Sequence, residues 1–223
     1  MTFAMDLTPL WLTLKVAGVA TMMTFVVGVN LAFLVARGKF WGREGLDALC
    51  TLPLVLPPTV LGYYLIVLIG RQGWLGRWLQ ETCGISLIFT WQGAALAAAV
   101  VSLPLIFKAA RAAFEEVDHN LEDAARTLGL SEAAVFLRVS LPLAWRGILA
   151  GTMIAFARAM GEFGATLMVA GNLPGKTQTL SLAVYNAVQA GNDAQATILV
   201  VLICTVCLAI LVVSGKALKA GYM

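Results

Sequence analysis

Five long apolar stretches, separated by shorter polar intervals, dominate the pattern of this chain. A helix that crosses a membrane needs about 20 predominantly apolar residues in succession. The pattern therefore predicts five transmembrane helices within one domain that covers residues 1–223. The expected spans lie at about residues 10–36, 46–69, 88–110, 147–170 and 196–214.

The composition agrees with this pattern. Hydrophobic residues make up 60% of the chain and charged residues 12%, whereas a soluble domain carries about 25% charged residues. We therefore expect an all-α integral membrane protein that is surrounded by membrane lipid. The formal net charge of +3 is too small to indicate a nucleic-acid partner.

Basic residues gather on one side of the expected spans. Arg37, Lys39 and Arg43 follow the first span, and Lys216 and Lys219 follow the fifth. Cytoplasmic loops of membrane proteins carry an excess of lysine and arginine. We therefore expect a multi-pass protein with its N-terminus outside and its C-terminus inside.

A polar segment, at about residues 111–146, interrupts the apolar pattern on the expected cytoplasmic side. Asn120 can cap a short helix whose first turn carries acidic residues, which the helix dipole favours. Gly129 stands where a left-handed residue would end that helix, and Ser131 can cap a second helix that ends near Pro142. We expect two short helices at an angle, suited to docking on a soluble protein. A plain amphipathic linker is the alternative.

Pro57 and Pro58 lie within the second expected span. Proline removes a backbone donor and clashes with the preceding turn, so this helix should be kinked or broken. Inside a bilayer, broken backbone is tolerated where protein covers it or where it lines a wet cavity. The prolines therefore indicate either a packing kink or a transport pathway.

Arg158 and Glu162 lie within the fourth expected span, four residues apart and so on one helical face, with Gly161 and Gly164 beside them. Ionisable groups at membrane depth usually face a partner or a water-filled interior. Two interpretations stay open. The pair can help helices to pack, with the glycines permitting close approach, or it can line or gate a pathway.

Two short patterns mimic binding motifs without the required context. Cys204 and Cys207 have a Cys-x-x-Cys spacing but lie in an apolar run without other ligands, which favours ordinary core residues over a metal or redox site. Residues 170–177 match the loosest phosphate-loop pattern, yet a membrane span rather than a strand precedes them. We therefore expect no metal and no bound nucleotide at these two patterns.

The polar segment resembles the cytoplasmic Glu-Ala-Ala loop of binding-protein-dependent ABC importer permeases. In that family, Glu-Ala-Ala is followed by three residues and a glycine, and about a dozen residues later by Leu-Pro. This sequence carries, in the same order, Asp123, Ala124, Ala125, Gly129, Leu141 and Pro142. Asp123 replaces the glutamate, and Glu122 stands immediately before it, so either acid could make the contact with the ATPase that the resemblance implies.

Three further stretches narrow the resemblance. Residues 156–166 (FARAMGEFGAT) look like the fourth-span signature of the molybdate and sulfate branch of these permeases. Residues 52–63 (LPLVLPPTVLGY) and 172–179 (NLPGKTQT) are similar to the molybdate subgroup. Together with the polar segment, the resemblance extends over essentially the whole chain.

This resemblance implies a type I ABC importer permease fold and a transport subunit, not an enzyme, in the cytoplasmic (inner) membrane of a prokaryote. It also implies no catalytic residue and no bound cofactor in this chain. It implies import of molybdate, or of the similar tungstate dianion, by alternating access. The implied partners are a second copy of the chain, two cytoplasmic ABC ATPase subunits that use ATP-Mg, and an external, periplasmic molybdate-binding protein. The implied coupling residues are Glu122, Asp123, Ala124, Ala125, Gly129, Leu141 and Pro142. The expected pathway or gate residues are Pro57, Pro58, Arg158, Gly161, Glu162 and Gly164.

Other functions compete with this interpretation. Sulfate, thiosulfate or another oxyanion could replace molybdate as the substrate of the same kind of permease. An ion-coupled secondary transporter would instead use Arg158 and Glu162 as a proton relay. A membrane assembly subunit would bind partners without transporting anything.

Overall fold

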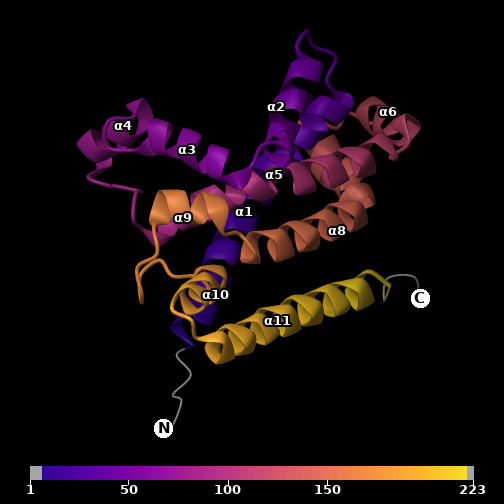
Figure 1. The fold of residues 1–223 in the computed structure, drawn as a ribbon. Coiled ribbons are helices and arrows are strands. Elements are labelled where there is room, and N and C mark those ends of the chain that lie inside the picture. The colour runs from indigo at the N-terminus through magenta and orange to yellow at the C-terminus, as the bar shows by residue number, and fades with distance from the viewer. Residues whose placement is uncertain (1–6, 220–223) are drawn as a thin grey trace.

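The computed structural model describes residues 7–219, and every regular element in that range is a helix (Figure 1). In chain order the elements are α1 (Thr8–Arg37), α2 (Arg43–Val55), α3 (Pro58–Ile69), α4 (Trp74–Cys83), α5 (Trp91–Glu115), α6 (His119–Thr127), α7 (Glu132–Val135), the π-helical turn η1 (Phe136–Ser140), α8 (Leu141–Met160), α9 (Gly164–Ala170), α10 (Leu180–Gln189) and α11 (Asp193–Lys219). The predicted all-α class is confirmed.

Within the described residues, four helical stretches are long and apolar enough to cross a membrane. They are α1, α5, the continuous rod of 29 residues that α7, η1 and α8 form, and α11 as far as Val212. The helices α2 and α3 supply a fifth candidate if they are counted as one broken span, bent by 117°. The architecture therefore matches the expectation of about five spans.

The break between α2 and α3 follows from its two prolines. Pro57 has an extended backbone (φ −57°, ψ 137°) and directly precedes α3, and Pro58 occupies the first turn of that helix. The first turn is where a missing backbone N–H leaves no hydrogen bond unmade. The prediction of a kinked or broken helix is thus confirmed, and the break falls at Leu56 and Pro57.

The predicted end of the second short helix near Pro142 is wrong. The helix that Ser131 caps continues through η1 into α8 without interruption. In the π-helical turn, the backbone N–H of Leu141 bonds the carbonyl of Phe136, five residues earlier. This wider turn accommodates Pro142 at the start of α8, because proline brings no N–H that would need a partner.

The fourth expected span, residues 147–170, is not one helix. The α8 helix ends at Met160, and α9 begins at Gly164 after a short non-helical link. The sequence contains two glycines at this link, Gly161 and Gly164, which lower the helix propensity there. The chain therefore has two broken apolar segments, one after α2 and one after α8.

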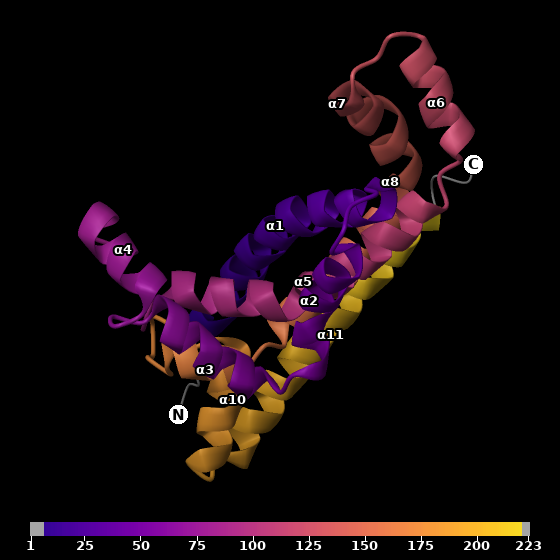
Figure 2. The same cartoon turned by 90° about the horizontal axis from the view of Figure 1, so that it is seen from above.

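Small residues allow the central helices to approach closely. The α1, α5 and α8 helices pack side by side (Figure 2). A Cβ atom added to Gly147 of α8 would lie 2.6 Å from the Cβ of Ala113 of α5, and one added to Gly28 of α1 would lie 3.3 Å from Ile106. Such close contact between small side chains replaces the hydrophobic effect as the source of helix association in a membrane.

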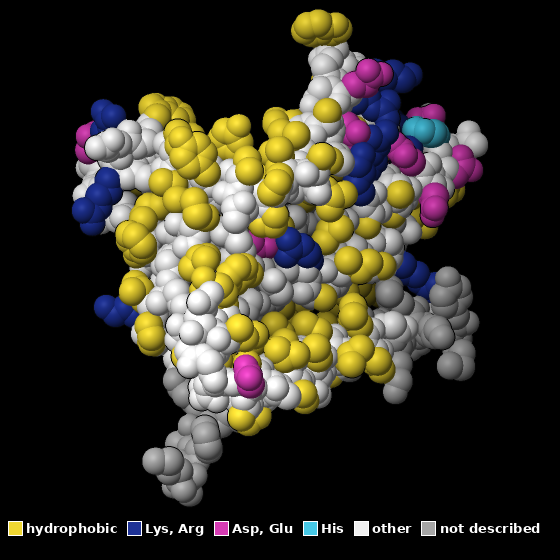
Figure 3. Space-filling model, in the orientation of Figure 1, with side chains coloured by type: hydrophobic (Ala, Val, Ile, Leu, Met, Phe, Trp, Pro, Cys, Tyr) yellow, Lys and Arg dark blue, Asp and Glu magenta, His cyan; other side chains and the backbone are white. Residues whose placement is uncertain are grey.

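The surface of the protein divides into an apolar body and one charged end. Large hydrophobic side chains such as Met22, Val55 and Leu208 are exposed on the body, as expected of residues that face lipid. Figure 3 shows basic, acidic and histidine side chains crowded around the end where α6 lies. That end is the natural candidate for contact with a soluble partner.

Candidate functional site

The helix α6 stands away from the apolar body at the charged end (Figure 2). Its N-cap is Asp118, whose carboxylate accepts a hydrogen bond from the backbone N–H of Asn120 at 2.9 Å. The predicted cap at Asn120 is therefore wrong by two residues. Asp118, which like asparagine has a side-chain oxygen that can accept a backbone hydrogen bond, caps the helix instead. The predicted stop is confirmed: Gly129 has φ +83° and follows the last turn, where a left-handed residue fits best.

A second cap holds the far side of the loop. The hydroxyl of Ser131 accepts a hydrogen bond from the backbone N–H of Ala134 at 3.4 Å, as predicted for the start of α7. Arg126 then joins the two helices, because its Nε and Nη2 donate to the carboxylate of Glu132 at 2.8 and 3.1 Å. These bonds hold the pKa of Glu132 below its ordinary value and raise the pKa of Arg126. The loop is thus a defined, braced structure and not a plain linker.

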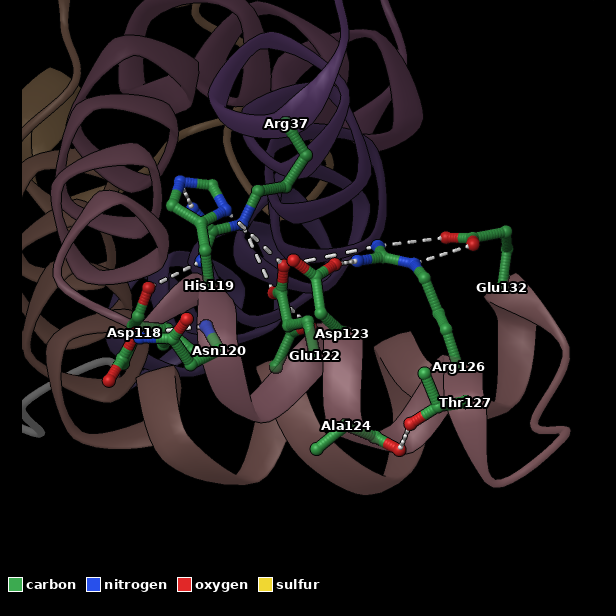
Figure 4. A network of polar contacts seen from close by, with 12 residues as sticks. Arg37, Asp118, His119, Asn120, Glu122, Asp123, Ala124, Arg126, Thr127 and Glu132 are labelled. Atoms are coloured by element: carbon green, nitrogen blue, oxygen red, sulfur yellow. Dashed lines mark hydrogen bonds and ion pairs between the residues drawn. The ribbon is translucent and has the colours of Figure 1, made fainter.

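Glu122 points into the protein and not toward solvent (Figure 4). Its side chain is 1% exposed, and its Oε1 accepts hydrogen bonds from Arg37 Nε at 3.1 Å and from the hydroxyl of Ser140 at 2.7 Å. The other oxygen, Oε2, has no hydrogen-bond partner among the described residues, but His119 Nδ1 lies 3.8 Å away. Of the two candidate acids, Glu122 is therefore out of reach of a partner's surface.

Arg37 provides the other half of this buried contact. It is the last residue of α1, and its side chain is 9% exposed. Its Nη2 donates to the carbonyl of Val117 at 2.7 Å, and its Nη1 lies 2.9 Å from Nε2 of His119. One guanidinium thus contacts the segment before α6 at Val117, the first residue of α6 at His119, and the buried face of α6 at Glu122. Sequence reasoning missed this role, because Arg37 counted there only as one of several basic residues near a membrane surface.

Asp123 is the next residue along α6, about 100° around the helix axis from Glu122, and its side chain is 69% exposed. Arg126 Nη1 donates to it at 2.7 Å, which leaves the carboxylate at the surface and oriented. The exposed side chains of Leu121, Ala124 and Leu128 are spaced three and four residues apart and form one small apolar face beside it. Such a face with a neighbouring charge suits a groove in a partner protein.

Other predicted residues of this loop support it from within. Ala125 is buried, so only Ala124 of the alanine pair contributes to the outer surface. Leu141 packs against the core cluster of α1, α5 and α8, while Pro142 is exposed at the start of α8. A hollow of about 440 Å³ beside α6 is bordered by Leu121 and Leu143, both about half exposed. The loop therefore presents an apolar helix face next to a recess.

The predicted pathway residues on α8 and α9 form a second site. Arg158 Nη1 lies 2.8 Å from Glu162 Oε2, and Glu162 Oε1 accepts a hydrogen bond from the backbone N–H of Ala165 at 2.9 Å. Glu162 is 2% exposed, whereas Arg158 is 37% exposed. The carboxylate thus caps the first turn of α9 and partly neutralises a guanidinium that still reaches the surface.

The two broken segments of the chain pack against each other. A Cβ atom added to Gly164 at the start of α9 would lie 3.1 Å from the Cβ of Pro58 at the start of α3. One turn further, a Cβ atom on Gly62 would lie 2.7 Å from the Cβ of Met168. The structure thus brings Pro58 and Gly164 together, with Pro57 and Glu162 in the adjoining links, while Gly161 is exposed. In the described range, no group of three or more potential metal ligands occurs.

Comparisons with solved structures agree with this arrangement. The inward-facing methionine ABC transporter MetNI superposes with a TM-score of 0.74 at 19% sequence identity, and the match covers 99% of both chains. At this level of identity the likeness shows the fold alone. It establishes that the arrangement of helices seen here is that of a type I ABC importer permease.

Comparisons of sequence give the relationship. The molybdenum transport system permease protein ModB of Escherichia coli (strain K12) is 48% identical over 178 residues, which are 80% of this chain and 78% of that protein. The ModB protein of Haemophilus influenzae is 43% identical over 83% of this chain and 81% of its own length. A family model matches residues 25–220. The chain belongs to the family of binding-protein-dependent transport system inner membrane components.

Proposed function

We propose that this chain is the membrane-spanning permease subunit of an ATP-driven importer that carries molybdate across the cytoplasmic membrane. The relatives named above, at 48% and 43% identity, support molybdate as the substrate class. Tungstate has the same charge and tetrahedral shape, so the permease should accept it as well. Hydrolysis of ATP-Mg belongs to a separate ATPase subunit in this proposal.

The observation that carries the proposal is the construction of α6. Its outer face presents Asp123, Ala124 and Leu128 to solvent, while its inner face is fixed to α1 through Glu122 and Arg37. A helix built in this way can be pushed by a partner and can pass the displacement to the membrane helices. We assign the outer face to a groove of the ATPase, and Asp123, not Glu122, to the charged contact there.

The proposed assembly contains two copies of this chain, two ATPase subunits at the α6 end and one external binding protein at the opposite end. The excess of basic residues at the α6 end supports a cytoplasmic location for it, with the N-terminus outside. Binding of ATP closes the ATPases and moves both α6 helices, and the permease then changes between outward and inward openings. The coupling residues of this chain are Asp123, Ala124, Ala125, Gly129, Leu141 and Pro142, with Glu122 as an internal support.

The pathway is proposed to pass the two broken segments. Arg158 offers a partly exposed positive charge that attracts a dianion, and Glu162 tempers that charge so that the anion is not held too tightly. Passage requires a site that is favourable to enter and easy to leave. Pro57, Pro58, Gly161 and Gly164 contribute the irregular backbone that is tolerated in a membrane beside a cavity.

Uptake into lipid vesicles tests the function. Vesicles that contain this chain with its ATPase and binding protein should accumulate molybdate when ATP is supplied to the ATPase side, and tungstate should compete. Sulfate should compete weakly. Accumulation that continues without ATP and follows an ion gradient would contradict the proposal and favour a secondary transporter.

A further inference from the structure

A hollow of about 420 Å³ lies at the end of the protein opposite α6, between the first turns of α1 and α5. Lys15 of α1 and Lys176 of the loop before α10 both line it, together with Trp11 and Trp91. The Nζ of Lys15 lies 3.7 Å from the centroid of the Trp91 ring, which fixes the position of its charge. Among residues 7–219, the lining of this hollow includes these two lysines and no acidic side chain.

The tryptophans place the hollow at the level of the membrane surface. Trp11 is 69% exposed and lies two turns before the exposed apolar positions of α1 begin at Val19. Tryptophan and lysine together are typical of the zone where lipid headgroups meet the hydrocarbon region. The hollow therefore faces headgroups, not bulk solvent alone.

A second hollow, of about 180 Å³, continues along the same two helices, and all its lining side chains except that of Thr24 are apolar. On α1 it is lined by Met23 and Val27, which lie eight and twelve residues beyond Lys15. These intervals are multiples of four, so the three side chains follow one ridge of the helix. Met23 and Val27 are 40% and 50% exposed, so this apolar groove opens to the membrane.

The α5 side of the groove follows the same direction. Leu96 and Leu103 line the apolar groove, and Gln92, which precedes them by four and eleven residues, lines the charged hollow. Spacings of four and eleven residues return to one helical face. Buried residues from the first halves of both helices share one core cluster, so α1 and α5 run in the same direction here. The two hollows are thus successive parts of one seam.

The dimensions of the seam fit one kind of molecule. Eight residues of helix correspond to about 12 Å along the axis, the separation of Lys15 from Met23. One leaflet contributes about 15 Å of hydrocarbon. A ligand that extends from the lysines to Met23 and Val27 therefore has an anionic end and an apolar portion about 12 Å long or more.

We propose that the seam between α1 and α5 binds one anionic phospholipid. Its phosphate lies between Lys15 and Lys176, and one acyl chain lies along Met23, Val27 and Leu103. A free oxyanion would satisfy the lysines but would leave the apolar groove unused, and an acidic loop of a soluble protein could not enter hydrocarbon. The site is independent of the proposed transport function.

Native mass spectrometry of the purified transporter, with phosphatidylglycerol added to the detergent micelles, tests the site. Removal of one lysine charge near a membrane surface weakens attraction to anionic lipid about fivefold. The variant Lys15→Gln/Lys176→Gln should therefore retain at least fivefold less phosphatidylglycerol than the wild type, whereas Lys15→Arg should retain it. The control Arg71→Gln removes a basic residue that lies between α3 and α4, outside the seam, and should change nothing. Equal retention in all variants would overturn the proposal.

Three further arms separate the possible occupants. Met23→Trp fills the apolar groove without touching the lysines and should also lower phosphatidylglycerol retention. The wild type should retain less phosphatidylcholine than phosphatidylglycerol. The double lysine variant should retain the two lipids equally. Displacement of the lipid by millimolar inorganic phosphate, or by an excess of the purified binding protein, would overturn the assignment in favour of an oxyanion site or a protein-docking site.

Discussion

Arg37 and Glu122 are separated by 85 residues, yet the guanidinium Nε of Arg37 lies 3.1 Å from the carboxylate Oε1 of Glu122 inside the protein. Arg37 ends the first long helix, and Glu122 belongs to the short helix α6 at the charged end. The ion pair therefore fixes the position of α6 relative to α1, which has few other contacts with it. A displacement of α6 reaches α1 through this pair.

The variant Glu122→Gln should lower the stability of the protein by about 3 kcal/mol, because it leaves the buried Arg37 without a counter-charge. Thermal unfolding of the purified protein measures this. The matched control is Asp123→Asn, which removes an exposed carboxylate one residue away and should cost at most about 1 kcal/mol. If the two variants unfolded at the same temperature, the buried pair would not be the main support of α6. The double variant Arg37→Met/Glu122→Met should recover part of the loss, since no unpaired charge remains.

The variant Gly129→Trp should uncouple ATP hydrolysis from uptake. No atom lies within 4 Å of a Cβ atom added to Gly129, so the bulk would project outward beside α6, and the positive φ adds a strain of about 1 kcal/mol. The measurement is the number of ATP molecules hydrolysed per molybdate imported, which should rise. Gly84→Trp is the control, because Gly84 also has a positive φ and open surroundings but follows α4, far from α6 (Figure 2). An unchanged ratio in Gly129→Trp would contradict the docking of α6 on the ATPase.

The variant Gly62→Ala should destabilise the contact between α3 and α9. The added methyl group would lie 2.7 Å from the Cβ of Met168 and 3.1 Å from the Cα of Ala165, and the backbone of α9 must then shift. Overpacking of this kind costs about 1–3 kcal/mol, which a lower midpoint of thermal unfolding would register. Gly18→Ala in α1 has open space around the new methyl group and should be neutral or slightly stabilising. Equal midpoints for the two variants would argue against close packing of the two broken segments.

The variant Arg158→Gln should reduce the rate of molybdate uptake at least tenfold while the ATPase remains stimulated by ATP and binding protein. It removes the partly exposed charge that the proposed pathway requires, and it leaves Glu162 as an uncompensated acid beside the anion. Arg158→Lys should restore much of the rate. Arg77→Gln, at an exposed position of α4, provides the control. Full uptake by Arg158→Gln would limit the pair to a role in packing.

The main architecture follows from the sequence because helices in a membrane must satisfy their own backbone hydrogen bonds. Apolar length therefore identified the spans, the two prolines identified the break before α3, and Gly129 identified the end of α6. The break after Met160 was missed, because the apolar pattern continues across Gly161 and Glu162. Hydropathy records how apolar a segment is and carries no information on where its axis turns.

The motif of the candidate site could be predicted from the sequence, but the buried contacts that hold the loop in place could not. The order of Asp123, Ala124 and Gly129 located the polar loop around α6, whereas the burial of Glu122 depends on Arg37, far away in the sequence. A single sequence gives no sign of which of two adjacent acids faces inward. That choice is made by the tertiary packing of α1 against the loop, which brings one guanidinium within reach of only one of them.

The π-helical turn between Phe136 and Ser140 has a consequence for the facing of α8. Each α-helical residue advances the side-chain direction by about 100°, and each residue of the wider π-helical turn advances it by less, so this turn sets the rotational phase of everything that follows it. With that phase, Gly147 and Gly151 point at α5, and their closest approaches are to Ala113 and Ala109. If the same five residues were wound as ordinary α-helix, Gly147 and Gly151 would be rotated away from α5. The winding of these five residues thus determines that the glycine side of α8 faces α5.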